Sequence, residues 1–389
     1  MMVFTIGIIG GEVSHAHYNH RHRLGKIRVF DLRTGRQCRV LQRRDLRRDA
    51  FITWLAQVPA GTVVAMEACS GAHHWARRCL EHGLQPKLIA AQFVKPFRKR
   101  QAVKNDRNDA EAIATAAQQG NMRFVPVKSV EQQARLAEHR IREGYKVEAL
   151  VVSNRLRGEL AEFGVIVAQG DGALRGVLGG LGELIAVPAS TRTVLDELQR
   201  HWRQLRERVV ACDARIAASA RADVRCTRLQ GIIGIGPLTA DALVASIGSG
   251  IDFKNGRQLA AWLGLTPAQH SSGGRTRLGA ITCRGDHYLR TLLIQGARSS
   301  LQRAKAVATP KATAEQIWIR ELAGRLPFGK VLAAIANKHA RQAWAMLARD
   351  EEYDPDAWLK HPMVQRPATR RATATETSAS TATAASITH

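Results

Sequence analysis

The first third of the chain alternates between short apolar runs and one helical run, as mixed α/β domains do. The runs typical of short strands lie at residues 3–9, 26–30, 38–41, 62–66, 87–90 and 122–127. A Thr34-Gly35 turn predicts that the second and third of these form a β-hairpin. Pro126 cannot donate a ladder hydrogen bond, so the last run is predicted to be an edge strand. Residues 72–82 have helical spacing and end at Gly83.

From residue 129 onward the apolar positions recur at three- and four-residue spacing, which predicts helices. Residues 129–163 form a long helical pattern that starts close to a capping box and is interrupted by Gly144. A glycine-rich patch at 170–182 separates it from a second long helix at 191–220. Two interpretations of the two helices stay open. They form an antiparallel or coiled-coil connector that serves oligomerisation, or an ordinary helical hairpin packed on its own domain.

Residues 229–243 carry a helix-hairpin-helix signature. Its turn contains Gly234 and Gly236, which would let backbone N–H groups approach a phosphate at the positive end of the following helix. A purely structural turn is the alternative. Further helices are predicted at 258–263, 282–297 and 330–348. Residues 364–389 are rich in Thr, Ala and Ser without apolar periodicity, which predicts a disordered tail.

These patterns divide the chain into four regions. An α/β domain is predicted at 1–128 and a helical or coiled-coil connector at 129–222. A mostly α domain with the helix-hairpin-helix is predicted at 223–350, followed by the tail at 351–389.

The charge of the chain indicates the kind of partner that it binds. The 389 residues include 58 Lys and Arg against 33 Asp and Glu, a formal net charge of +25, which predicts a polyanionic partner. No apolar run approaches the ~20 residues of a membrane span, and residues 1–10 lack the features of a signal peptide. Six scattered cysteines without CxxC spacing argue against a zinc site and indicate a reducing cytoplasm. Aromatic residues make up only 5%, which favours phosphate contacts over base stacking.

Asp106 and Asp109 are the sharpest chemical signal. They lie three residues apart at the start of an alanine-rich helical run, so both carboxylates can approach one cation. Oxygen ligands suit Mg²⁺ or Mn²⁺, and Glu67 adds a carboxylate at a strand end. A basic strip that fits phosphodiester chemistry comprises Lys95, Arg98, Lys99, Arg100 and Lys104. Acids that only cap a helix, and a Glu that is only a surface charge, are the alternatives.

Residues 264–279 form a glycine-rich loop with nucleophilic and basic side chains. Ser271 and Ser272 precede two glycines, and Arg275 and Arg277 follow them. Arginines can clamp a phosphate, and an activated Ser hydroxyl can attack a phosphodiester. An ordinary loop is the alternative. The helix predicted at 282–297 would direct further arginines toward the partner, among them Arg284 and Arg290.

Several blocks of this sequence resemble one known family in the same order, from about residue 26 to 350. The family is that of the DEDD insertion-sequence transposases related to the Piv/MooV DNA invertases, the insertion-sequence family one-ten of bridge-RNA-guided recombinases. The blocks are Met66-Glu67-Ala68-Cys69, Ala72-His73-His74-Trp75-Ala76-Arg77, Phe93-Val94-Lys95-Pro96, Lys104-Asn105-Asp106, Asp109-Ala110-Glu111-Ala112-Ile113, Arg123-Phe124-Val125-Pro126-Val127-Lys128-Ser129, Gly234-Ile235-Gly236-Pro237, His270-Ser271-Ser272-Gly273-Gly274, Arg284-Gly285-Asp286 and Tyr288-Leu289-Arg290.

The resemblance implies a fold, a mechanism and partners. It implies a RuvC-like, ribonuclease-H domain whose four acids bind Mg²⁺ or Mn²⁺, and a C-terminal domain whose serine attacks DNA and holds it covalently. By motif, Glu67, Asp106 and Asp109 match three of the acids, and Ser272 matches the nucleophile, with Ser271 the weaker candidate. The implied partners are the element ends and target DNA, an element-encoded guide RNA and further copies in a dimer or tetramer. The implied location is the bacterial cytoplasm, at the nucleoid.

The sequence departs from the family where the first acid is expected. Ile9 stands at that position, residues 10–25 match nothing in the family, and the nearest carboxylates are Glu12 and Asp31. Loss of a ligand weakens a shared metal site. Three hypotheses therefore stay open: an active recombinase, a decayed copy that only binds DNA or RNA, and, less favoured, a DEDD-type exonuclease. Restoring Asp at position 9 alone is not expected to rescue activity if residues 10–25 disrupt the strand.

Overall fold

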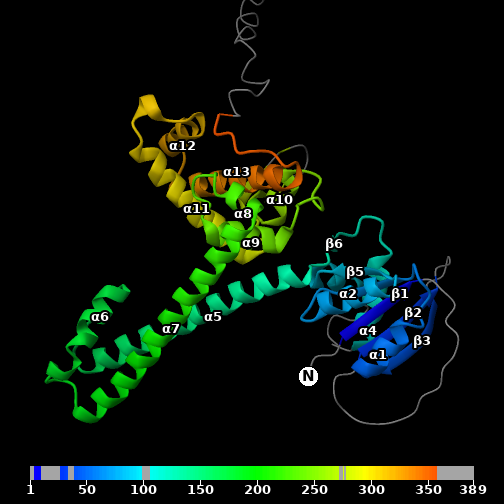
Figure 1. Ribbon diagram of the computed structural model, residues 1–389, viewed down its shortest axis with the longest axis horizontal. Helices are drawn as coiled ribbons and strands as arrows, with labels where there is room; N and C mark the ends of the chain where they lie inside the picture. The colour runs from blue at the N-terminus through cyan, green and yellow to red at the C-terminus, as the bar shows by residue number, and fades with distance from the viewer. Residues whose placement is uncertain are drawn as a thin grey trace, which may run out of the picture. The chain divides into compact units, whose positions relative to one another are not determined.

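The computed structural model describes residues 4–9, 27–33, 39–98, 106–270, 275 and 277–356 (Figure 1). For residues 4–9, 27–33, 39–45, 48 and 106–110 the description is of the backbone alone. The chain divides into two compact units, residues 1–133 and residues 134–389. The first unit holds a mixed sheet with helices, and the second is mostly helical. The disordered tail predicted at 364–389 lies outside the described residues.

The strands of the first unit occur where the apolar runs predict them. They are β1 (Phe4–Ile9), β2 (Ile27–Arg33), β3 (Arg39–Leu46), β4 (Val63–Glu67), β5 (Gln85–Ile89) and β6 (Phe124–Val125). They form one sheet in the order β3-β2-β1-β4-β5-β6. The hairpin of β2 and β3 and the edge position of β6 are confirmed. β4 and β5 are parallel and are joined through helix α2 (Ala72–Glu81).

β1 runs parallel to β2 and antiparallel to β4. In this register Ile6 pairs with Met66, and Ile9 pairs with Val63 at the beginning of β4. Glu67 is at the other end of β4, four residues further on, which corresponds to roughly 13 Å of strand. The position where the first acid is expected therefore lies at the opposite end of the strand pair from Glu67.

Helices cover both faces of this sheet because the side chains of β4 alternate between two cores. Val64 and Met66 pack with α2 and with α1 (Arg48–Leu55), while Ala65 packs with α4 (Asp106–Ala117). The predicted helices α2 and α4 are confirmed, but the sequence patterns did not identify α1. Two short segments, α3 (Ala91–Val94) and η1 (Lys95–Phe97), follow β5.

In the second unit two long helices, α5 (Val130–Glu162) and α7 (Ala189–Ala222), lie side by side (Figure 1). Ion pairs join Glu138 to Arg215 and Arg142 to Asp213, so the helices are antiparallel. The predicted interruption at Gly144 is wrong, because packing on α7 outweighs the ~1 kcal/mol that glycine costs inside a helix. The glycine-rich patch includes a short helix, α6 (Asp171–Gly179), followed by η2 (Leu181–Glu183).

The remaining helices of the second unit surround one apolar core. They are α8 (Val224–Leu229), α9 (Pro237–Ile247), α10 (Gly256–Trp262), α11 (His287–Ala306), η3 (Thr309–Lys311), α12 (Ala314–Arg325) and α13 (Phe328–Ala348). Residues predicted as a loop form a hairpin of β7 (Pro267–Gln269) and β8 (Leu278–Ile281). Among the helices of the described residues, none has the length and apolar content that crossing a bilayer requires.

Candidate functional site

Glu67 ends the central strand β4 and is the predicted acid whose side chain the structure describes. Its carboxylate lies 3.7 Å from the guanidinium of Arg98, and about a quarter of each side chain is exposed (25% and 28%). Arg98 follows η1 and belongs to the predicted basic strip. Desolvation, and then the charge of Glu67, raise the pKa of the Cys69 thiol above its usual value. The site presents a carboxylate balanced by an arginine.

Asp106 and Asp109 both lie in the first turn of α4, as predicted. This helix packs against β4 and against η1, the segment that precedes Arg98. The side chains of both aspartates, and all of Lys99, Arg100 and Lys104, lie outside the described residues. Among the side chains that are described, no three His, Cys, Asp or Glu gather in a group able to hold a metal ion.

The hairpin of β7 and β8 carries the predicted serine loop. Ser271 and Ser272 lie outside the described residues. The ends of the loop are held by a hydrogen bond in which the His270 N–H donates to the Arg277 carbonyl at 2.9 Å. Arg275 and Arg277 are exposed, so two predicted phosphate ligands lie on the surface of this hairpin.

The turn between α8 and α9 contains three glycines, and two of them, Gly234 and Gly236, have different physical roles. Gly234 has φ +96°, and a Cβ there would come within 2.2 Å of the Gly296 carbonyl on α11. Close packing of the turn on α11 therefore requires this glycine. Gly236 is exposed, caps the start of α9, and a Cβ there would meet nothing within 4 Å. Of the two, Gly236 has room for a phosphate.

Two of the predicted nucleic-acid ligands differ in exposure. Arg284 is exposed, and Lys95 in the first unit is exposed as well. Arg290, in contrast, is 8% exposed. Its Nη1 donates to the carbonyls of Leu263 and Arg284, both at 3.0 Å. Direct contact between Arg290 and DNA is therefore not supported, because the guanidinium is engaged with two backbone segments inside the protein.

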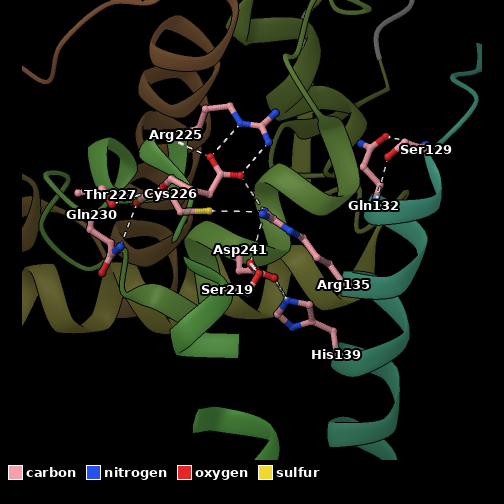
Figure 2. A network of polar contacts seen from close by, with 11 residues as sticks. Ser129, Gln132, Arg135, His139, Ser219, Arg225, Cys226, Thr227, Gln230 and Asp241 are labelled. Carbon is pink, nitrogen blue, oxygen red and sulfur yellow. Dashed lines mark hydrogen bonds and ion pairs between the residues drawn. The ribbon is translucent and has the colours of Figure 1, made fainter. Parts of the chain in front are cut away.

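A buried polar network that the sequence patterns did not identify joins α5 to α7, α8 and α9 (Figure 2). Arg135 lies 2.9 Å from Asp223 and 3.5 Å from Asp241. Asp241, 1% exposed, is 3.1 Å from His139, and the Ser219 hydroxyl donates to it at 2.7 Å. A lone acid in the apolar run of α9 was the available signal, because a buried carboxylate needs partners.

Two further residues extend the network. Arg225 donates twice to the carboxylate of Asp223, at 2.7 and 3.0 Å, and hydrogen bonds from Arg225 and then Arg135 lower the pKa of Asp223 to about 2. The hydroxyl of Tyr288 on α11 lies 2.9 Å from the second ring nitrogen of His139. Burial raises the pKa of Tyr288 well above its usual range. The network therefore fixes α5, α7, α8, α9 and α11 relative to one another.

Comparison with known proteins identifies relatives over most of the chain. Residues 226–312, which run from α8 to η3, match the family model described as Transposase IS116/IS110/IS902 family. A "Probable family 20 transposase" of Pseudomonas aeruginosa is 44% identical over 81% of this chain and 92% of that protein. The transposase for insertion sequence element IS1111A of Coxiella burnetii is 38% identical, over 81% and 85%. The transposase for IS1328 of Yersinia enterocolitica is 35% identical, over 79% and 89%.

Proposed function

This chain belongs to the IS116/IS110/IS902 family of insertion-sequence transposases, and from that membership we propose that it cuts and rejoins DNA with carboxylates and a serine. The observation that carries the proposal is the position of Glu67. It ends a central strand, parallel to β5 and antiparallel to β1, of a sheet covered by helices on both faces, and functional groups of α/β domains gather at such strand ends. That arrangement supports a RuvC-like domain.

The three acids fit a hard divalent cation. Glu67, Asp106 and Asp109 would hold Mg²⁺ or Mn²⁺, because carboxylate oxygens are the ligands that these ions prefer. The position of Glu67 supports this assignment, since a cation, the guanidinium of Arg98, already lies 3.7 Å from its carboxylate. When bound, such an ion polarises a scissile phosphate. Arg98, released from Glu67, would then contact the phosphate.

Ser272 is the proposed nucleophile, with Ser271 as the weaker candidate. The hydroxyl oxygen would form a bond to phosphorus while the bond between phosphorus and the departing deoxyribose oxygen breaks. The serine loses its proton and the departing oxygen gains one, which leaves a phosphoserine ester to DNA. The exposed side chains of Arg275 and Arg277 support this assignment, because they can neutralise the phosphate at the loop.

Other surfaces would hold the DNA backbone. The exposed start of α9 at Gly236, reached from α8 through a glycine-rich turn, supports a helix-hairpin-helix that binds phosphate without reading sequence. Exposed Lys95 and Arg284 would add positive charge, and Lys99, Arg100 and Lys104 extend the basic strip in sequence. The net charge of +25 supports a second polyanion, which we propose is the element's guide RNA.

We propose that the protein acts as a dimer or tetramer in the bacterial cytoplasm, at the nucleoid. The supporting observation is an apolar surface on α5 that its packing with α7 leaves exposed. The exposed apolar side chains of α5 include Ile141, Val147, Leu150 and Val151. These residues would lie between copies of the chain, where burial of apolar area stabilises association.

The second candidate function is a decayed transposase that binds DNA or RNA without cutting. The presence of Ile9 where an acid is expected favours it, and so does the register that pairs Ile9 with Val63 instead of with the end of β4. Three acids without the fourth would bind the cation more weakly.

A covalent adduct separates the two functions. The purified protein would be incubated with Mg²⁺, the element's RNA and labelled donor and target DNA, then run on a denaturing gel. An adduct that persists in Ser271→Ala and disappears in Ser272→Ala is the expected result for the recombinase. Binding without an adduct, cured when residues 1–25 are replaced by a strand with the family's Gly-Ile-Asp block, would establish the decayed copy. Binding with no adduct after that repair would refute the serine mechanism.

A further inference from the structure

Trp262 differs from the other described tryptophans in its exposure. It lies at the end of α10 and is 40% exposed, whereas Trp54, Trp75, Trp202 and Trp344 are buried. Trp318 is partly buried, and its ring already has the Lys338 ammonium over it at 4.4 Å. The ring of Phe253 contacts it edge-on, with the ring centroids 5.5 Å apart. Such a contact fixes the orientation of the indole and leaves its outer side open. An exposed, oriented indole is a surface on which a flat ring can stack.

The backbone around Trp262 is pressed against the segment that carries Arg284. A Cβ at Gly285 would lie 1.8 Å from the Trp262 carbonyl, and a Cβ at Gly264 would lie 2.3 Å from the Arg284 carbonyl. Both glycines have positive φ (+80° and +70°). Only glycine allows this approach, which brings the backbone next to the exposed Arg284 against the backbone of the exposed Trp262.

Buried Arg290 holds the two segments together. Its Nη1 donates to the Leu263 carbonyl on one side and to the Arg284 carbonyl on the other. Asp286 is used inside the protein as well, because it caps α11 through the Leu289 N–H. Of the three charged residues Arg284, Asp286 and Arg290, Arg284 is therefore the one whose exposed side chain can contact a partner. Two more exposed cations, Lys254 and Arg257, come shortly before Trp262 in the sequence.

The surface lies at the base of the serine hairpin. The Cys283 N–H donates to the Gly264 carbonyl at 3.2 Å, and the Thr282 N–H donates to the Thr266 carbonyl at 2.9 Å. Both ends of the β7–β8 hairpin thus start from the segments that present Trp262 and Arg284.

We propose that Trp262 stacks on an unpaired nucleobase of the DNA strand that is cut, while Arg284 contacts the adjoining phosphate. The proposal rests on the DNA-cutting function proposed above and identifies a base-binding position for it. An aromatic face beside a guanidinium is the combination that single-stranded nucleic acid prefers, because every base has a π-face and every nucleotide has a phosphate. It is a local exception to the low aromatic content of the chain.

Fluorescence anisotropy with the full-length protein tests the proposal. The probes are a labelled single-stranded DNA, the RNA of the same sequence and the DNA duplex, each titrated at several salt concentrations. Trp262→Ala is expected to weaken binding of single-stranded DNA about tenfold and to leave the salt dependence unchanged, since stacking releases no counterion. Trp262→Phe keeps a π-face and is expected to retain most of the affinity. Ile251→Ala, which removes an apolar side chain that is 73% exposed nearby in sequence, is the matched control and should bind like the parent.

Arg284→Ala has a different expected signature. It should lower the slope of log affinity against log salt by about 0.7, the value for one phosphate contact on a single strand. The proposal is overturned if Trp262→Ala binds single-stranded DNA as the parent does, or if Trp262→Phe is as weak as Trp262→Ala. A loss confined to RNA also overturns it, because the occupant would then be RNA. These outcomes leave the proposed function intact if the parent still forms its serine adduct, whereas a parent that binds no DNA sinks both.

Discussion

Replacing Arg135 by alanine is expected to destabilise the second unit more than replacing any exposed charged residue in it does. The substitution removes the cation 2.9 Å from Asp223 and 3.5 Å from Asp241. Breaking a buried ion pair commonly costs about 3–5 kcal/mol, because a charge is left without its partner. Asp223 keeps Arg225, and Asp241 keeps Ser219, so we expect the lower end, about 3 kcal/mol.

Hydrogen–deuterium exchange measures this change where it occurs. Peptides from α9 and from the first turns of α5 should exchange about a hundredfold faster in Arg135→Ala, if exchange proceeds through opening of this unit. The matched control is Arg215→Ala, which breaks the more exposed Glu138–Arg215 pair between α5 and α7. Solvent screens that pair, so its loss should change exchange little.

A double-mutant cycle isolates the ion pair from other effects of the substitution. Asp241→Asn removes the buried charge and preserves the shape of the side chain. Combined with Arg135→Met, it should cost less than the two single changes together, since neither charge is then left alone. If Arg135→Ala exchanges no faster than Arg215→Ala, or if the two single changes simply add, the network does not fix these helices as argued.

The remaining predictions concern acid stability, a turn and the missing acid. Burial lowers the pKa of His339 to about 4 from its usual 6.5, so the contribution of the neutral imidazole to stability is present above pH 6.5 and is lost as pH falls toward 4. The urea midpoint should therefore fall between pH 6.5 and 4, and it should fall less steeply in His339→Gln than in the parent. Gly234→Ala should lower the thermal midpoint because its Cβ meets the Gly296 carbonyl, and an unchanged midpoint would contradict the packing described. Ile9→Asp alone should leave the yield of serine adduct as it is in the parent, because position 9 is remote from Glu67 in this register; a rise to the yield of the chain repaired at residues 1–25 would show the register to be wrong.

The apolar periodicity predicts most elements because a strand or helix reveals its buried face locally. Two of the helices that it missed, α1 and α12, also carried signals. In α1 the buried Phe51, Trp54 and Leu55 follow helical spacing over one short stretch. In α12 the signal is a capping box, in which Thr313 and Gln316 bond each other's backbone. Short helices with few apolar residues are recognised by their ends better than by their faces.

The roles of the arginines could not be predicted in the same way. Arg284 and Arg290 lie six positions apart in one basic segment, yet one is exposed and the other is buried. The buried guanidinium of Arg290 donates to the carbonyl of Leu263, which is 27 residues away in sequence. Arg135 likewise finds its carboxylates on α8 and α9, far along the chain. A guanidinium can donate to a carbonyl, a carboxylate or a phosphate, so the residue type alone does not tell an arginine that stabilises the fold from one that contacts DNA.

The direction of β1 bears on whether this copy cuts DNA. Because β1 is antiparallel to β4 and Ile6 pairs with Met66, the position opposite Glu67 is Thr5, one step toward the N-terminus. Opposite positions on neighbouring strands bring their Cβ atoms within about 5.5 Å, close enough for two carboxylates to share a cation. Ile9 is at the far end of the pair, so in this register an acid at position 9 would lie far from Glu67. If this copy does not cut DNA, we therefore expect that a repair has to replace residues 1–25 as a whole, because a change at position 9 leaves the register of β1 as it is.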